Sequence, residues 1–255
     1  MKRLNERQKK ELDLARNSHF LTVKQLSRLL DVSEMTIRRD VSFLAQNGYI
    51  SKVYGGIVAV KPREENNYIV SEEMKKNKEL KQKIAQKAVT LIHSNDVIFF
   101  DSGTTVQLLA EALPTDFVCT AISSSFNTLN VLAKITNSTI ITPGGVLAQK
   151  PKVFYDQDSI KAIKRYRAHI AFIGATGYEL EMGPTCAYIE DSPLKRAIME
   201  SSKKKVLLID SSKFGVVSAC SFAKIGDFTT VITDSGIPAE YIEQIQTNKT
   251  ELIIV

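Results

Sequence analysis

The chain has 255 residues, of which 44% are hydrophobic and 24% are charged, and this composition argues against wholesale disorder. It contains no apolar run of the roughly 18–20 residues that a membrane-spanning helix needs. No apolar segment follows the basic residues 1–7, so we predict no secretory signal and expect a cytoplasmic protein.

The positive charge is concentrated near the start of the chain. Residues 1–60 hold 11 lysines and arginines against 6 aspartates and glutamates, a net charge of +5, whereas the whole chain carries +6. Such an excess favours a module that binds a polyanion, with a merely soluble surface as the alternative. The three cysteines and three histidines lack the spacing of zinc ligands, so we expect neither a metal site nor a cofactor.

The first elements are predicted to be helices. One is expected over residues 7–17. Thr22 and Gln25 then have the spacing of a capping box, in which each side chain bonds the other residue's backbone N–H. The helix that they open covers residues 23–30, where apolar residues recur with the helical period.

A short turn over residues 31–33 separates this helix from the next one, which is expected to end at Asn47-Gly48. Its inward positions, at spacings of four and three, are Ile37, Val41 and Leu44. An alternating segment over residues 49–54 and a Gly55-Gly56 turn then predict a hairpin that ends at Val60. Two helices around a tight turn followed by a hairpin form a winged helix-turn-helix, which binds DNA.

The predicted DNA-binding residues lie on the second of these helices and on the hairpin. A guanidinium group can form two hydrogen bonds with a guanine edge or a phosphate, and a hydroxyl can reach either acceptor. The candidates are Ser33, Thr36, Arg38, Arg39 and Lys52, the last of which suits a contact with the DNA backbone. A solvated basic face is the alternative, but the place of the arginine pair after a capped helix and a tight turn favours DNA.

The rest of the chain is predicted to form a separate domain. Residues 61–67 are polar and contain a proline, and residues 72–78 are rich in charge, so we interpret residues 61–77 as a linker between residues 1–60 and residues 78–255. A helix is expected over residues 78–94. Apolar strands then alternate with helices, which predicts an α/β, Rossmann-like domain with a largely parallel sheet.

Ligands of such domains gather beyond the carboxyl ends of the strands. Residues 101–105 follow a strand there and open a helix, whose unpaired N–H groups favour a phosphate. A simple N-cap is the alternative interpretation of these five residues. The candidate effector-binding residues at this edge are Asp101, Ser102, Gly103, Thr104, Thr105, Ser123, Ser124, Gly144, Gly145, Asp210 and Lys213. Lys213 supplies a positive charge for a phosphate, and Asp210 could bind a sugar hydroxyl or pair with Lys213.

Both halves resemble one family. The segment from Leu21 to Asp40 and the Tyr54-Gly55-Gly56 turn are similar to the DNA-binding domain of the DeoR repressors, with residues 36–40 at the recognition helix. Residues 101–105, 143–145, 171–174, 183–185 and 210–215 are similar to the family's effector domain, which is related in fold to ribose-5-phosphate isomerase.

The resemblance covers nearly the whole chain. It implies a repressor of a sugar-metabolism operon, a phosphorylated sugar or related intermediate as effector, and homo-oligomeric binding to operator DNA. The chain departs from the family at Ser123-Ser124-Ser125 and at residues 154–157, which lack an expected glycine. The second departure leaves open whether the loop near Tyr155 contributes to the ligand site.

Two other functions are possible from the sequence. A sugar-phosphate isomerase with an added DNA-binding domain needs a carboxylate base, but residues 144–149 and 173–177 contain none, and only a base displaced to Glu179 or Glu181 remains. We therefore predict a regulator and not an enzyme. A non-specific nucleic-acid binder is the third interpretation, and it predicts similar affinity for any duplex.

Overall fold

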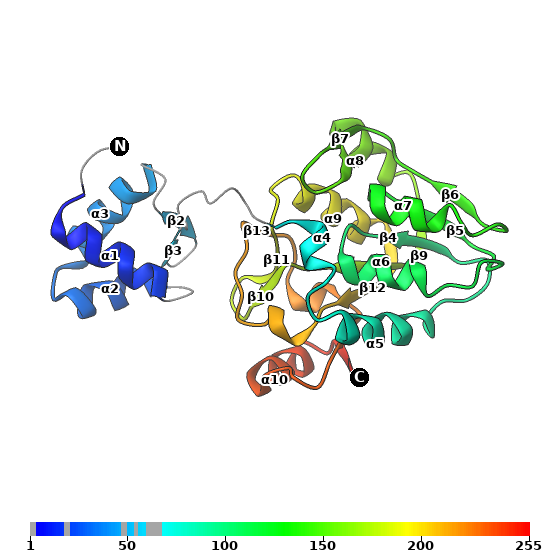
Figure 1. The fold of residues 1–255 in the computed structure, drawn as a ribbon. Coiled ribbons are helices and arrows are strands. Elements are labelled where there is room, and N and C mark those ends of the chain that lie inside the picture. Colours follow the sequence, from blue (N-terminus) through cyan, green and yellow to red (C-terminus); the bar gives the residue numbers. More distant parts are fainter. Residues whose placement is uncertain (1–3, 18–20, 47–49, 54–55, 60–67) are drawn as a thin grey trace. The chain divides into compact units, whose positions relative to one another are not determined.

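The computed structural model describes residues 4–17, 21–46, 50–53, 56–59 and 68–255 (Figure 1). The chain divides into two compact units, Met1–Asn67 and Tyr68–Val255. No helix within the described ranges combines the length and the apolar character that crossing a membrane requires.

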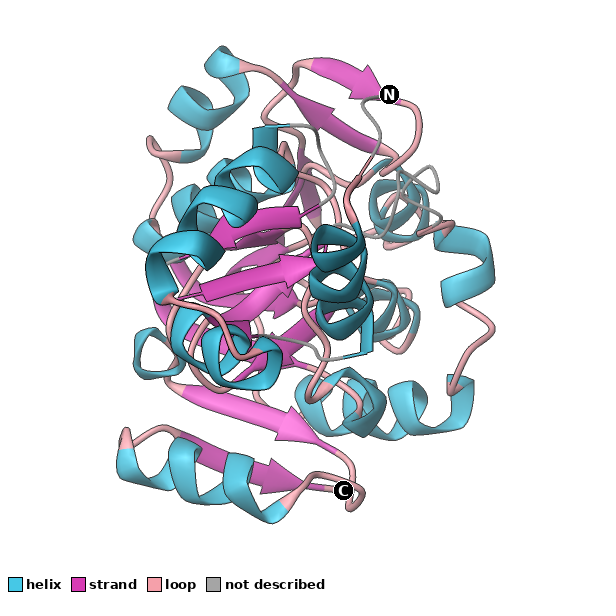
Figure 2. Cartoon of the chain, turned by 90° about the vertical axis from the view of Figure 1, so that its left-hand side faces the viewer, coloured by secondary structure: helices cyan, strands magenta, loops and turns pink. Residues whose placement is uncertain are grey.

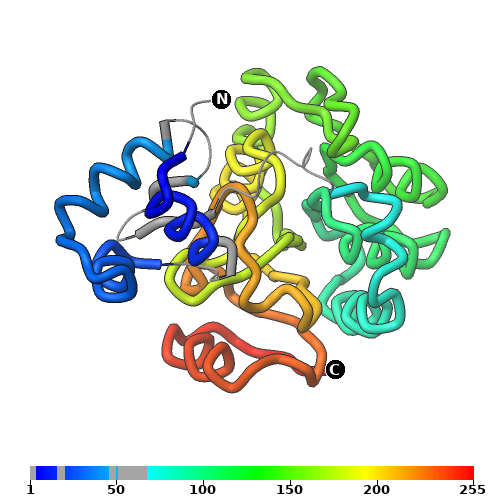
Figure 3. The backbone as a smooth tube through the Cα atoms, turned by 60° about the vertical axis from the view of Figure 1, so that its left-hand side comes forward, coloured from blue at the N-terminus to red at the C-terminus, as the bar shows by residue number. Residues whose placement is uncertain are grey.

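The N-terminal unit is a winged helix-turn-helix. Its elements are α1 (Glu6–Asn17), β1 (Leu21–Thr22), α2 (Val23–Leu30), α3 (Glu34–Gln46), β2 (Ile50–Val53) and β3 (Gly56–Ala59). The strands form an antiparallel sheet in the order β1-β3-β2. The blue part of the tube in Figure 3 follows the three helices. The predicted helix end at Asn47-Gly48 and the turn at residues 54–55 lie outside the described residues.

Local sequence explains how these helices begin and end. Thr22 caps α2 through the predicted box, since Gln25 N donates to Thr22 Oγ1 at 3.1 Å and Thr22 N donates to Gln25 Oε1 at 2.8 Å. Asp31 ends the helix in the left-handed conformation, with φ 52°. Ile37 and Leu44 of α3 are fully buried against Leu26 of α2, as the spacing predicted.

The second unit is built on a parallel sheet of seven strands in the order β15-β14-β12-β9-β4-β5-β6 (Figure 2). The strands are β4 (Val97–Phe100), β5 (Thr120–Ser123), β6 (Thr139–Ile141), β9 (Ala168–Gly174), β12 (Ser202–Leu208), β14 (Thr230–Thr233) and β15 (Glu251–Ile254). Each neighbouring pair is parallel. The predicted fold class is confirmed.

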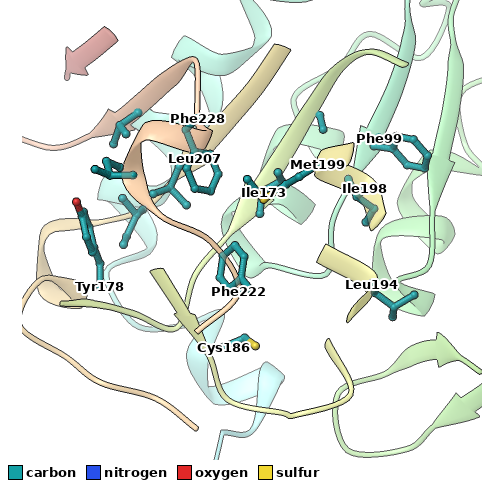
Figure 4. Packing of buried hydrophobic residues seen from close by; sticks show 14 of the residues in the cluster. Phe99, Ile173, Tyr178, Cys186, Leu194, Ile198, Met199, Leu207, Phe222 and Phe228 are labelled. Atoms are coloured by element: carbon teal, nitrogen blue, oxygen red, sulfur yellow. The ribbon is translucent and has the colours of Figure 1, made fainter. Parts of the chain in front are cut away.

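Helices cover both faces of this sheet. They are α4 (Val70–Glu73), α5 (Lys78–Val89), α6 (Thr104–Glu111), α7 (Phe126–Leu132), α8 (Gln157–Ile163), α9 (Asp191–Glu200) and α10 (Ala239–Thr247). Side chains of β4 alternate between the faces: Ile98 and Phe100 pack with α5 and α6, while Phe99 packs with α9. Figure 4 shows part of the hydrophobic core between the sheet and α9, in which Leu194 and Ile198 of α9 lie near Phe99 and Ile173.

Two small antiparallel sheets were not predicted. One is the hairpin of β7 (Val146–Ala148) and β8 (Val153–Tyr155), and the other contains β10 (Gly177–Glu179), β11 (Gly183–Cys186) and β13 (Cys220–Ser221). Short single-turn helices η1 (Ser211–Lys213) and η2 (Ile225–Asp227) complete the unit.

The segment before α5 differs from the predicted linker. Residues 61–67 lie outside the described part, but residues 68–77 belong to the second unit and include α4. Helical periodicity does not reveal α4, because the helix is only one turn long and its ion pairs include lysines distant in the sequence. The helix expected over residues 78–94 ends earlier, at Val89.

Candidate functional site

The start of α6 presents unsatisfied backbone donors. Gly103 is the N-cap residue and offers no side chain to the helix, so the interpretation of this stretch as a simple side-chain cap does not match the geometry. The N–H groups of Gly103, Thr104 and Thr105 donate to no acceptor among the described residues. Both threonine side chains are buried. Free N–H groups at a helix start attract an anion.

Two glycines bring this loop against β9. A Cβ atom on Gly103 would lie 3.1 Å from the Cα of Gly174, and a Cβ atom on Gly174 would lie 3.0 Å from the Cα of Gly103. Both distances are too short for comfortable packing, so the close approach of the two backbones depends on glycine at both positions. Gly174 thereby joins the loop after β9 to the one after β4.

These loops line a pocket that encloses about 560 Å³, part of it open to solvent. Of the predicted effector-binding residues, it contains Ser102, Gly103, Thr104, Thr105, Asp210 and Lys213. Asp101 and Ser124 line a smaller hollow that shares Ser102 and Asp191 with the pocket. Buried Ser124 Oγ has no hydrogen-bond partner among the described residues.

Three other candidates line neither space. Ser123 Oγ accepts a hydrogen bond from Ser125 N at 3.1 Å. Gly144 and Gly145 have positive φ angles of 82° and 110°, and the carbonyl of Gly144 accepts from Ser159 Oγ at 2.8 Å. A Cβ on Gly145 would lie 2.2 Å from that Oγ. The two glycines therefore form a turn beside the start of α8, and the structure does not bring them to the pocket.

A buried lysine that the sequence analysis missed lies at the pocket floor. Lys195 is 3% exposed, donates to the carboxylate of Asp101, and also donates to the carbonyl of Gly174 at 3.0 Å. The same carboxylate accepts from Gly174 N at 3.0 Å. Burial disfavours the charge of Lys195, but Asp101 and Asp191 together raise its pKa above the ordinary value. Burial raises the pKa of Asp191 to about 7, although Lys195 opposes this shift.

A second ionic cluster lies in the pocket wall. Lys213 pairs with Glu73, and buried Lys81 donates to the Glu73 carbonyl at 2.7 Å and to its carboxylate at 3.3 Å. Burial opposes the charge of Glu73, but Lys213 and Lys81 hold its pKa below the ordinary value. Burial lowers the pKa of Lys81, and Glu73 offsets this only partly.

Asp210 does not form the ion pair with Lys213 that the sequence left open, because Lys213 pairs with Glu73 instead. Asp210 accepts hydrogen bonds from Asn77 Nδ2 at 3.1 Å and from Ser212 N at 3.2 Å. Lys213 is closer to Glu73 because the segment before α5 packs over η1. No local signal reveals that partner, since Glu73 is far away in the sequence.

The predicted DNA-binding residues of α3 lie on its outer face. Ser33, Arg38 and Arg39 are exposed and Thr36 is half-buried. Ser33 Oγ accepts from Thr36 N at 3.3 Å and so caps the helix. Arg38 has a weak contact with Glu34 at 3.5 Å, whereas Arg39 has no ion-pair partner in the described part of the chain. Lys52 lies in β2, opposite Ile57 of β3, and its side chain is outside the description.

Two buried acidic residues lie where α1 packs against α3: Glu11 of α1 and Asp40 of α3. Asp40 accepts from Arg7 Nε at 2.6 Å and from Gln8 Nε2 at 3.1 Å, which fastens α1 to α3. Glu11 is fully buried, and neither of its carboxylate oxygens has a hydrogen-bond partner among the described residues. Burial and the charge of Asp40 raise the pKa of Glu11 to about 7.

Comparison with known proteins decides the family. Residues 7–63 match the model of the DeoR-like helix-turn-helix domain, and residues 76–235 match that of the DeoR C-terminal sensor domain. The chain belongs to the DeoR family. It is a DNA-binding transcriptional regulator of that family, and we call its second unit the sensor unit.

Curated relatives match over almost their full length. The deoxyribose operon repressor of Escherichia coli (strain K12) is 31% identical over 253 residues, which are 98% of each chain. The HTH-type transcriptional regulator GolR of Listeria innocua is 34% identical over 233 residues, or 91% of each chain. A solved structure of ribose 5-phosphate isomerase A from Methanocaldococcus jannaschii matches 54% of this chain and 55% of its own, with 21% identity and a TM-score of 0.41.

The described residues show little sign of a metal site or of a catalytic base. No group of three or more histidine, cysteine, aspartate or glutamate residues that could hold a metal ion occurs in the ranges that the structure describes. Glu179, which was considered as a displaced base, accepts hydrogen bonds from Glu181 N and Met182 N in its own turn. Neither Glu179 nor Glu181 lines the pocket.

Proposed function

We propose that the pocket binds a phosphorylated sugar or a related intermediate, with the phosphate at the start of α6. The observation that supports this most directly is the set of free N–H groups of Gly103, Thr104 and Thr105 beside a pocket that also contains lysines. Partial positive charge at a helix start and full charges on lysines both favour a phosphate. Asp210, in the same pocket, suits a sugar hydroxyl.

The N-terminal unit is proposed to bind operator DNA through α3. Arg39 is exposed and unpaired in the described chain, so its guanidinium group is free to contact a base edge. Ser33, Thr36 and Arg38 lie on the same helix, and Lys52 of the hairpin would contact the backbone. A homo-oligomer would present two such helices to spaced half-sites.

The regulator is proposed to repress a sugar-metabolism operon and to act in the cytoplasm. The first part is supported by its Escherichia coli relative, which is named as a deoxyribose operon repressor. Catalysis is not proposed. The pocket does contain the carboxyl groups of Asp191 and Asp210, but the family of this chain consists of DNA-binding regulators. Absence of turnover in a pentose-phosphate isomerisation assay would agree with this assignment, and measurable turnover would contradict it.

A Thr104→Val variant tests the ligand site. Thermal unfolding of the full chain with a panel of phosphorylated sugars should identify a ligand by a raised midpoint, because a ligand that binds only the folded state stabilises it. The variant keeps the shape but loses a hydroxyl, and should bind that ligand about tenfold more weakly. It should bind operator DNA as the wild type does. Thr115→Val, an exposed change outside the pocket, is the control; equal ligand affinity in both variants would reject the site.

A further inference from the structure

The segment that connects the sensor unit to the DNA-binding unit also forms a wall of the pocket. We call residues 68–77 the entry segment; Tyr68 is the first residue of the sensor unit, and Tyr68, Val70 and Glu73 line the pocket. Figure 1 shows α4, which belongs to this segment, beside the start of α6. A displacement of the entry segment would therefore move the point at which the chain of the sensor unit continues toward the DNA-binding unit.

Pocket residues hold both ends of the entry segment. At one end, Tyr188 Oη donates to the carbonyl of Tyr68 at 2.7 Å, and the two rings make an edge contact with their centres 6.2 Å apart. At the other end, Asn77 Nδ2 donates to Asp210 at 3.1 Å. Tyr188 and Asp210 both line the pocket, so a ligand there would meet the groups that fix this segment.

The centre of the entry segment is held by charge. Glu73 is 5% exposed, and its carboxylate receives both Lys81 and Lys213, while exposed Lys76 adds a longer contact of 3.4 Å. The helix that carries Glu73 spans only four residues. A helix so short is not stable by itself, since isolated helices of fewer than about 12–15 residues are marginal in water. The ion pairs of Glu73 therefore help to keep α4 in place, together with the hydrogen bonds at the two ends of the segment and the packing of Met74 against the core.

Glu73 adds a negative charge beside two of the lysines that line the pocket. Lys81, Lys195 and Lys213 face the carboxyl groups of Glu73, Asp191 and Asp210 among the lining residues, and Lys195 is also paired with Asp101. A phosphate monoester brings about −1.5 to −2 charges at pH 7. If it entered beside Glu73, like charges would lie close together around the same two lysines, which disfavours binding. Departure of the Glu73 carboxylate removes this repulsion.

We propose that Glu73 is an internal competitor of the effector's phosphate: its carboxylate holds Lys81 and Lys213 in the unliganded protein, and an entering phosphate takes these lysines and releases α4. This inference rests on the proposed function, because it requires a phosphorylated ligand in this pocket. It adds the route of regulation, in which ligand binding frees the segment that leads to the DNA-binding unit. The free energy of ligand binding is then coupled, through the release of α4, to the arrangement of the DNA-binding helices.

A pair of glutamine variants of the full chain tests the competition. Glu73→Gln keeps the size of the side chain and removes its charge, and Glu72→Gln is a matched control because Glu72 is its exposed neighbour. Inorganic phosphate is the probe, titrated by calorimetry. Glu73→Gln should bind phosphate roughly tenfold more tightly than the wild type, since one charge-assisted contact no longer has to be broken. Glu72→Gln should stay within about twofold.

Hydrogen exchange of the wild-type chain and of Glu73→Gln provides a second measurement. The N–H groups of Glu73 and Met74 donate to Ile69 and Val70 carbonyls, each at 2.9 Å. Saturating phosphate should speed the exchange of both amides, whereas in Glu73→Gln they should exchange fast without phosphate. If Glu73 only stabilises the fold, phosphate should slow the exchange of these two amides, and Glu73→Gln should bind phosphate no more tightly than the wild type.

The outcomes separate the two proposals. If phosphate does not bind the wild type, or binds Thr104→Val equally well, the pocket is not the phosphate site and both proposals fail. If phosphate binds and Thr104→Val weakens it, but Glu73→Gln binds no more tightly than Glu72→Gln and the α4 amides stay protected, the ligand site stands and the competition is refuted.

Discussion

The buried pair of Lys195 and Asp101 offers a quantitative test of the sensor unit. A Lys195→Met change keeps an unbranched side chain of similar length but removes the charge. It leaves Asp101, which is 4% exposed, with the N–H of Gly174 and a long contact from Ser102 at 3.4 Å. Removal of one partner from a buried ion pair costs about 3–5 kcal/mol because the other charge stays buried. For a unit of this size, such a loss lowers the unfolding midpoint by roughly 10 °C.

Urea unfolding of the full chain, followed by near-ultraviolet circular dichroism, measures this loss. Six of the eight tyrosines belong to the sensor unit, so its unfolding dominates the signal. Lys203→Met, at an exposed position of β12, is the matched control and should change stability by less than about 0.5 kcal/mol. Adding Asp101→Asn to Lys195→Met should restore more than half of the loss, because no unpaired charge then remains. The reasoning would be refuted if Lys195→Met lowered the free energy of unfolding by less than about 1 kcal/mol, or if the double variant with Asp101→Asn were no more stable than Lys195→Met alone.

Three further predictions concern other parts of the chain. Burial raises the folded-state pKa of Glu11 from 4.5 to about 7, so the folded state keeps a proton that the unfolded state releases, and stability should fall as pH rises from about 4.5 to 7. In urea unfolding across this range, the free energy of unfolding of Glu11→Gln should depend less on pH than that of the wild type. The same pH dependence in both proteins would disprove the raised pKa of Glu11. Arg39→Ala should weaken operator binding about 5- to 150-fold in fluorescence anisotropy, against little change for exposed Lys10→Ala, and equal effects of both would speak against base contact. Gly174→Ala should lower the free energy of unfolding by about 1–3 kcal/mol, since its Cβ would meet Gly103, and an unchanged unfolding midpoint would show that the two loops can separate freely.

The sequence by itself determined the elements whose causes are local. The capping box of Thr22 and Gln25 involves residues three apart, so its spacing alone specified the start of α2. The inward face of α3 followed from helical periodicity. The start of α6 could be located because an apolar strand, a glycine and two threonines follow one another within a few residues of the chain.

The position of each loop along the sheet was decided only by the tertiary structure. Among the loops that line the pocket are those after β4, β9 and β12, which are neighbours in the strand order, and Pro151 of the turn between β7 and β8 also reaches it. Gly144 and Gly145 directly follow β6, the edge strand, which lies three places from β9. At about 4.8 Å per strand, this separation is roughly 14 Å, so these two glycines follow the correct edge of the sheet without lining the pocket.

The partners of the buried charges were also invisible in the sequence. Lys195 and Asp101 are 94 residues apart, and Lys213 and Glu73 are 140 apart. Any lysine can pair with any carboxylate, and charge has no periodicity that would reveal its partner. What selects the pair is burial, since a lysine removed from water is stable only beside a carboxylate that the fold brings to it. Local sequence patterns thus specified the helices and strands, while the packing of distant segments determined which charged side chains form pairs.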